Sequence, residues 1–123
     1  MSQFRDRIGA LADRAAADRA AFDPPADPPD EERALGYLRD GVGDVVACYV
    51  DARTGDLVGL DREEMALLER ALNDWLELYA RCHGRRIDAE FTAREIADLV
   101  VDTRDLVDAA QLLTGVPPRE TVK

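Results

Sequence analysis

The sequence predicts an all-α protein, an antiparallel helical bundle of three core helices preceded by an Ala-rich N-terminal helix. Three observations support this prediction. Apolar residues recur at spacings of three and four along three segments, two of these segments begin with a capping motif, and glycine follows both. We divide the chain into an N-terminal helix (1–22), a Pro-rich linker (23–30), a helical bundle domain (31–116) and a loose tail (117–123).

The first predicted helix has only a thin apolar stripe. Residues 2–21 are rich in alanine, and their apolar stripe steps by four and three through Phe4, Ile8, Leu11 and Ala15. The prolines of residues 23–30 then exclude a helix and indicate a stiff, extended linker. The first helix therefore either completes a four-helix bundle in its own chain or packs on another subunit.

The segment after the linker admits two interpretations. Spacing of three and four favours one helix, with the stripe Leu35, Leu38, Val42, Val45, Tyr49 and Ala52. Gly41 and Gly43 each weaken this helix by about 1 kcal/mol relative to alanine. The alternative is a hairpin with strands at 45–51 and 57–60, turning at 53–56. We favour the helix because an isolated hairpin among helices has little sheet to join.

The third and fourth predicted helices share the same start signals. Each begins with a capping box and a hydrophobic staple, which pair residues Asp61 with Glu64, Leu60 with Met65, Thr92 with Glu95, and Phe91 with Ile96. The third seam is Met65, Leu68, Leu72, Trp75, Tyr79 and Cys82, and the fourth is Ile96, Leu99, Thr103, Leu106, Ala110 and Leu113. Gly84 and Gly115 supply the stops. Since no breaker separates Ile96 from Leu113, we expect one unbroken fourth helix.

The charge balance predicts a protein of a high-salt cytosol. The chain carries 26 acidic and 16 basic residues, a net charge of −10, and its only lysine is Lys123. Such acidity keeps a protein hydrated in molar salt, where a Debye length of about 3 Å screens self-repulsion. We see no signal peptide and no membrane-spanning segment, so we expect cytoplasmic localisation and no membrane partner.

The chemistry-bearing residues are few. Cys48 and Cys82 lie in apolar stretches and are expected to be buried free thiols, and with His83 they form no metal site. The sequence has one serine and no Gly-rich phosphate loop. The acidic residues of the third helix, Glu64, Glu69 and Glu77, are expected to be solvated. We therefore expect no enzyme, no cofactor and no metal.

Three stretches resemble a family of short uncharacterised haloarchaeal proteins. They are Asn73-Asp-Trp-Leu-Glu-Leu-Tyr-Ala-Arg-Cys-His-Gly84, Phe91-Thr-Ala-Arg-Glu-Ile-Ala97 and Gln111-Leu-Leu-Thr-Gly-Val-Pro117. The resemblance covers about the C-terminal two-thirds of the chain. It implies salt adaptation, and it implies no activity, cofactor or site residue.

One cluster of cations interrupts the acidity. We call it the basic patch; it comprises Arg81, His83, Arg85, Arg86 and Arg94, which face only Asp88 and Glu90 nearby. Next to a helix N-terminus, such a patch could hold a small anion or contact nucleic-acid phosphates. The alternative is that these side chains complement the helix dipole and pair with neighbouring carboxylates.

The function that we expect from the sequence is association. An undocked first helix would leave apolar surface for a second copy of the chain or for an unknown cytosolic protein, and the expected contact residues are Phe4, Ile8, Leu11, Trp75 and Tyr79. A regulator that binds nucleic acid is the alternative. A helix-turn-helix reader is disfavoured because the fourth helix lacks a turn and its face carries Asp102, Asp105 and Asp108.

Overall fold

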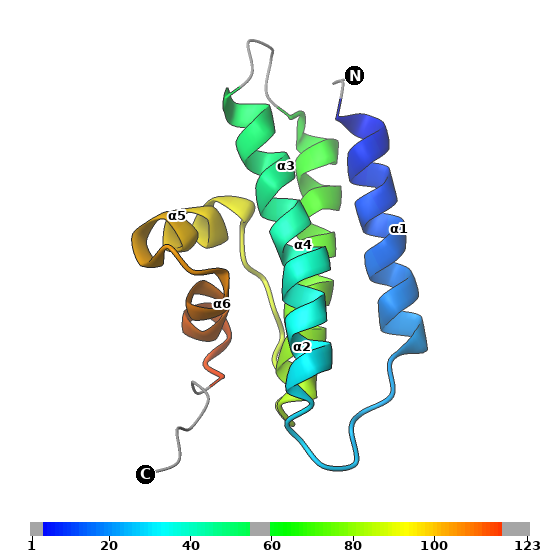
Figure 1. Cartoon of the computed structure of the whole chain (residues 1–123). Coiled ribbons are helices and arrows are strands. Elements are labelled where there is room, and N and C mark those ends of the chain that lie inside the picture. The colour runs from blue at the N-terminus through cyan, green and yellow to red at the C-terminus, as the bar shows by residue number, and fades with distance from the viewer. Residues whose placement is uncertain (1–3, 55–59, 117–123) are drawn as a thin grey trace.

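The fold consists of helices joined by short connections (Figure 1). The computed structural model describes residues 4–54 and 60–116. Within these residues no strand is present, and the all-α prediction is confirmed. The helical elements are α1 (Arg5–Ala21), α2 (Glu31–Tyr37), a π-helical segment (Leu38–Val42), α3 (Gly43–Thr54), α4 (Arg62–Cys82), α5 (Ala93–Thr103) and α6 (Leu106–Thr114).

Helix α1 docks on α4 of its own chain. The two helices run in the same direction (Figure 1), since Arg5 pairs with Glu63 at 3.3 Å near their starts and Arg19 pairs with Glu77 at 2.6 Å further along. The thin stripe of α1 is buried against this core. Of the two predicted placements for the first helix, the structure shows the one within the chain.

The second predicted helix is one rod with a π turn at its centre. Helix α2, the π segment and α3 follow one another without a break and run opposite to α4 (Figure 1). The predicted stripe is buried from Leu38 to Ala52, but Leu35 is 38% exposed and Ala34 is buried instead. A π turn bonds i to i+5, so its extra residue rotates the preceding helix relative to the core. The hairpin alternative is wrong for 45–51, and residues 57–59 of its second strand lie outside the described residues.

The predicted capping boxes both form. Asp61 accepts a hydrogen bond from the Glu64 amide at 2.7 Å, and its own amide donates to the Glu64 side chain at 3.0 Å. Thr92 and Glu95 make the equivalent pair at the start of α5. Between the two helices, Gly84 adopts a φ of 76° and the chain turns back along α4 as an extended segment.

The fourth predicted helix is wrong as one element, because the structure divides it into α5 and α6. Arg104 adopts a left-handed φ of 57° and ends α5. Asp105 then caps α6 by accepting a hydrogen bond from the Asp108 amide at 3.1 Å. An aspartate competes for backbone donors at a helix start, so it can break a helix without glycine or proline. Gly115 ends α6 with a φ of 72°, as predicted, and the tail 117–123 lies outside the described residues.

The linker closes over one end of the bundle. Residues 22–30 contain no regular secondary structure, and the Asp30 amide donates to the Cys82 carbonyl at 2.8 Å. Cys48 and Cys82 are buried free thiols, as predicted. Across the described part of the chain, no helix is both long and apolar enough to traverse a lipid bilayer.

Candidate functional site

The structure disperses the basic patch, and its first two members contact aromatic rings. The guanidinium carbon of Arg81 lies 5.0 Å from the ring centroid of Phe22. Phe22 follows the last residue of α1 and is therefore distant from Arg81 in the sequence. His83 packs against Tyr79, with 5.0 Å between ring centroids. Both side chains are half-buried. Each is therefore part of the packing around the end of α4.

The remaining members of the basic patch do not converge. Arg85 donates a hydrogen bond to the Gly115 carbonyl at the end of α6. Arg94 lies on α5 and pairs with Asp98 at 3.8 Å. Arg86 is exposed and makes no hydrogen bond or ion pair among the described residues. The structure therefore does not form one anion site from these five residues.

The expected association residues are not a surface. Ile8, Leu11, Trp75 and Tyr79 are buried in the core of their own chain, and Phe4 is half-buried against it. This is a correction to the expected contact set, and its cause is the docking of α1 on α4. Association of the protein would have to use other residues.

A helix-turn-helix motif needs a turn between its two helices. The turn that the sequence lacked is present between α5 and α6 at Arg104. The surface around this turn is nevertheless acidic, because Asp102, Asp105 and Asp108 are all exposed there. A negative surface repels nucleic-acid phosphates, so the charge around this turn does not favour nucleic-acid binding.

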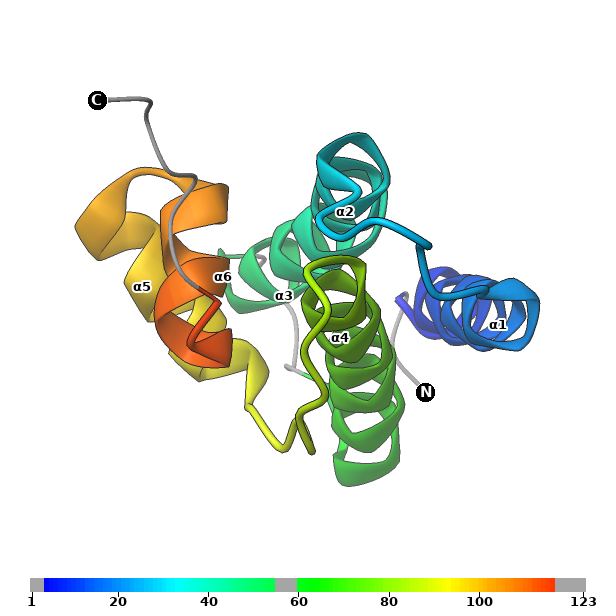
Figure 2. The same ribbon diagram turned by 90° about the horizontal axis from the view of Figure 1, so that it is seen from below.

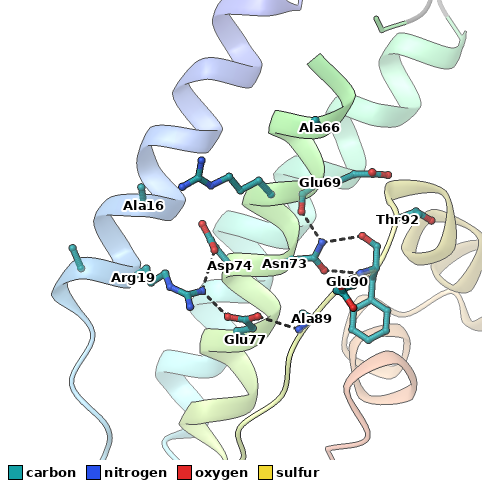
Figure 3. A pocket seen from close by; sticks show the side chains of 13 residues that line it. Ala16, Arg19, Ala66, Glu69, Asn73, Asp74, Glu77, Ala89, Glu90 and Thr92 are labelled. Carbon is teal, nitrogen blue, oxygen red and sulfur yellow. Dashed lines mark hydrogen bonds and ion pairs between the residues drawn. The ribbon is translucent and has the colours of Figure 1, made fainter. Parts of the chain in front are cut away.

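An open groove runs along α4. We call it the α1–α4 groove; α1 forms one wall and the extended segment before α5 forms the other (Figure 3). Its volume is about 830 Å³. Its lining comprises Ala16, Arg19, Ala20, Ala66, Glu69, Arg70, Asn73, Asp74, Glu77, Ala89, Glu90, Phe91 and Thr92.

A ladder of hydrogen bonds holds the extended wall in place. Three α4 side chains, four residues apart, each accept from a backbone N–H, and the N–H groups are two residues apart. The pairs are Glu77 with Ala89 at 3.0 Å (Figure 3), Asn73 with Phe91 at 2.8 Å, and Glu69 with Ala93 at 2.8 Å. Four helical residues rise about 6.0 Å and two extended residues about 6.6 Å, so the two repeats match.

Asn73 is the central rung because it bonds in both directions. Its Oδ1 accepts from the Phe91 amide, and its Nδ2 donates to the Phe91 carbonyl at 2.9 Å. Nδ2 also donates to the Glu69 carbonyl one turn earlier at 2.9 Å. The Asn73 side chain thus supplies the hydrogen bonds that a neighbouring strand would otherwise make with the extended segment, which has no sheet to join.

The expectation that the acidic residues of this helix are solvated is wrong. Glu69 and Glu77 are half-buried rungs of the ladder, and Glu64 is buried in its capping box. The sequence did contain a signal, since Glu69, Asn73 and Glu77 recur every fourth residue beside the apolar seam. The extended partner could not be identified without the fold.

Arg19 joins the α1 wall to the floor of the groove. One guanidinium nitrogen, Nη1, lies 3.0 Å from Asp74 Oδ1 and 2.6 Å from Glu77 Oε1 (Figure 3). The hydrogen bond to Glu77 raises the pKa of Arg19, against the opposing effect of burial. The two carboxylates are thereby held in fixed positions on the floor, with further lone pairs available to a ligand.

The described residues include no group of three or more potential metal ligands.

A family model with the description "Domain of unknown function (DUF8055)" matches residues 2–118 of the chain, well beyond the part that carries the resemblance noted in the sequence. No curated protein and no solved structure matches the chain.

Proposed function

The chain belongs to the family described as a domain of unknown function (DUF8055), and because this family supplies no activity, we propose a function from the groove. We propose that the protein is a non-enzymatic adaptor that binds a basic segment of another protein in the α1–α4 groove. The observation that carries this proposal is an open groove of about 830 Å³ with a mainly acidic charged lining.

The charge of the groove indicates which class of partner it would bind. Its lining contains four carboxylates (Glu69, Asp74, Glu77 and Glu90) and two guanidinium groups (Arg19 and Arg70), a net charge of −2. The whole chain carries −10, so the wider field has the same sign. A segment with arginine or lysine is complementary to this surface, whereas a second copy of the acidic chain is not.

The shape of the groove suits a peptide backbone. Four alanines line the walls and floor, from α1, α4 and the extended segment: Ala16, Ala20, Ala66 and Ala89. Such small side chains allow a bound chain to approach closely. The volume also falls within the roughly 300–1,000 Å³ typical of ligand sites in proteins.

Two acidic side chains of the groove are held by hydrogen bonds within the protein. Glu77 bonds Arg19 with one oxygen and the Ala89 amide with the other, while Glu69 bonds the Ala93 amide. Side chains that are already fixed lose little conformational entropy on binding. This preorganisation supports a binding role rather than a loosely solvated surface.

The proposed setting is the cytoplasm of a haloarchaeon. The support is the composition, with a net charge of −10 and one lysine in 123 residues. In molar salt, long-range attraction is screened over about 3 Å. Direct charge-assisted hydrogen bonds within the groove would then supply the affinity.

A titration with designed peptides tests this proposal. We expect a peptide of alternating arginine and alanine to bind at low and at molar salt, with backbone NMR shifts confined to the groove lining. The same peptide with glutamate in place of arginine should not bind. Equal binding of both peptides, or shifts centred away from the groove, would overturn the proposal.

Two matched variants locate the site. Glu90 and Asp88 are both exposed on the extended segment, but only Glu90 lines the groove. We expect Glu90→Arg to weaken binding of the basic peptide about fivefold, the scale of one surface ion pair, and Asp88→Arg to leave it nearly unchanged. Equal loss in both variants would show general attraction to an acidic protein. Light scattering of the protein alone measures its molecular mass and so shows whether a second copy of the chain binds instead of the peptide.

A further inference from the structure

Two carboxylates on the floor of the α1–α4 groove are more enclosed than the other acidic partners of ion pairs. Asp74 and Glu77 have side chains that are 17% and 19% exposed. In the remaining ion pairs of the described residues, the carboxylate side chain is 50–72% exposed. Asp74 and Glu77 lie three positions apart on α4, so they are neighbours on one face of the helix. Like charges this close repel each other, and a cation between them removes the repulsion.

Arg19 supplies this cation, but it uses only part of its capacity to donate hydrogen bonds. Its Nη1 alone contacts both carboxylates, at 3.0 Å from Asp74 Oδ1 and 2.6 Å from Glu77 Oε1. A guanidinium group has five N–H donors in one plane and can bind two oxygens through two different nitrogens. The Arg19 side chain is also 53% exposed. A guanidinium that enters from the open groove can therefore make a fuller contact than Arg19 does.

The floor does not depend on Arg19 for its position. Glu77 accepts from the Ala89 amide through its other oxygen, Oε2, at 3.0 Å. This rung of the ladder ties Glu77 to the extended segment on the opposite side of the groove from α1 (Figure 3). The acidic floor therefore stays in place when the Arg19 side chain leaves it.

Helix α1 is likewise held by contacts that do not involve Arg19. The helix lies at the outer edge of the bundle, beside α4 and away from α5 and α6 (Figure 2). Its apolar stripe is buried, and its Asp18 accepts a hydrogen bond from the Trp75 indole at 2.8 Å. Arg19 lies in the last turn of the helix. Its side chain can therefore move away from the floor while α1 stays docked.

We propose that Asp74 and Glu77 form a guanidinium subsite, which Arg19 fills in the free protein and an arginine of a bound basic segment fills in the complex. The second part of this inference rests on the proposed function of the groove. The planar guanidinium fork reaches two carboxylates at once, whereas the ammonium group of lysine is a compact point charge. Arg19 is thus an internal competitor, and the groove selects arginine over lysine.

Two small cations test the subsite without a peptide. Ethylguanidinium and ethylammonium carry the same charge and the same alkyl group, and molar NaCl screens the general field of the acidic chain. The readout is the NMR shift of the Ala89 amide, which bonds Glu77. We expect Arg19→Ala to bind ethylguanidinium about tenfold more tightly than the wild type does, and about tenfold more tightly than it binds ethylammonium. Equal affinities in either comparison would rule out the subsite.

Arg7→Ala is the matched control for the loss of a positive charge. Arg7 is also an arginine of α1 in an ion pair, with Asp51 at 2.9 Å, but it is not part of the groove lining. In this variant the Ala89 amide should report no tighter binding of ethylguanidinium than in the wild type. A gain as large as that of Arg19→Ala would mean that net charge alone governs binding, against the proposal.

A second pair of variants removes a negative charge from the Arg19→Ala protein. Asp74→Asn takes away one carboxylate of the subsite and no rung of the ladder, and it should weaken ethylguanidinium binding about tenfold. Asp88→Asn lies on the extended segment outside the groove lining and should leave binding unchanged. Equal effects of the two changes would contradict the subsite. The indole signal of Trp75, the single tryptophan, shows in the same spectra that α1 remains docked.

Peptides separate this inference from the proposed function of the groove. We expect the arginine–alanine peptide to bind Arg19→Ala about tenfold more tightly than the wild type, and a lysine–alanine peptide to bind the wild type about tenfold more weakly than the arginine–alanine peptide does. Equal affinities in both comparisons would overturn the competition by Arg19 and leave the proposed function intact. If neither protein binds a peptide but Arg19→Ala still binds ethylguanidinium, the proposed function fails and the subsite stands.

Discussion

Gly41 and Trp75 touch so closely that no side chain fits between them. A Cβ atom built on Gly41 would lie 2.4 Å from Cδ2 of Trp75. The indole ring is fully buried, its N–H donates to Asp18 at 2.8 Å, and the guanidinium of Arg14 lies 5.4 Å from its centroid. Trp75 on α4 therefore contacts both α1 and the π segment, and these contacts prevent its ring from moving to make room for a larger residue at position 41.

Substitution of Gly41 should destabilise the protein. We expect Gly41→Ala to cost about 1–3 kcal/mol of unfolding free energy, because the new methyl group overpacks the Trp75 ring. The matched control is Gly36→Ala, where a Cβ meets nothing within 4 Å. Since alanine favours helix, the control should gain about 0.5–1 kcal/mol. Urea denaturation measures both, and equal effects of the two substitutions would contradict the packing argument.

Gly41 also shows what the sequence could not predict. The residue weakens the predicted helix when only propensity is considered, and the reason for it is a contact with Trp75, 34 positions away. The capping boxes were predictable because their partners lie three residues apart. The groove was not, since its ladder pairs α4 with a segment whose path depends on the whole fold.

The break at Arg104 was harder to predict than the capping boxes and easier than the groove, because its signal in the sequence is local but weak. Arg104 takes a left-handed conformation with a φ of 57°, which costs a non-glycine residue about 1–2 kcal/mol. We expect Arg104→Gly to stabilise the protein by about 1 kcal/mol. The control is Asp102→Gly in the last turn of α5, where glycine should destabilise by about 0.5–1 kcal/mol. Thermal unfolding should separate them, and destabilisation by Arg104→Gly would argue against the two-helix arrangement.

Asn73 is the central residue of the hydrogen-bond ladder between α4 and the extended segment. We expect Asn73→Ala to destabilise the protein by about 1–3 kcal/mol, because the amide and carbonyl of Phe91 both lose their partner. Asn73→Asp should cost less, since the carboxylate still accepts from the Phe91 amide. Hydrogen exchange of that amide reports the site directly and should quicken most in Asn73→Ala. The neighbouring change Arg70→Ala, at an exposed position, should stay within about 0.5 kcal/mol. Unchanged exchange in Asn73→Ala would refute the ladder.

The buried cysteines should be unreactive. Burial raises the pKa of Cys82 from 9.0 to about 11, and burial also raises that of Cys48. Because the thiolate is the reactive form, we expect Cys82 to react with a thiol reagent about a hundredfold more slowly than an ordinary thiol at mildly alkaline pH. Unfolding in urea should restore the normal rate for both. Rapid reaction of one thiol in the folded protein would contradict the burial of that residue.

The stability of the protein should fall on mild acidification through His83. Burial lowers the pKa of His83 in the folded state, although Glu31 opposes the shift. At pH values near the ordinary pKa of 6.5, the unfolded chain therefore binds more protons, and unfolding becomes easier as the pH falls. We expect the wild type to lose more unfolding free energy than His83→Gln between about pH 7.5 and about pH 5.5. The carboxylates are common to both proteins, so the difference between the two slopes isolates the imidazole. A steeper loss in His83→Gln would mean that the folded state stabilises the imidazolium, with Glu31 as its counter-ion.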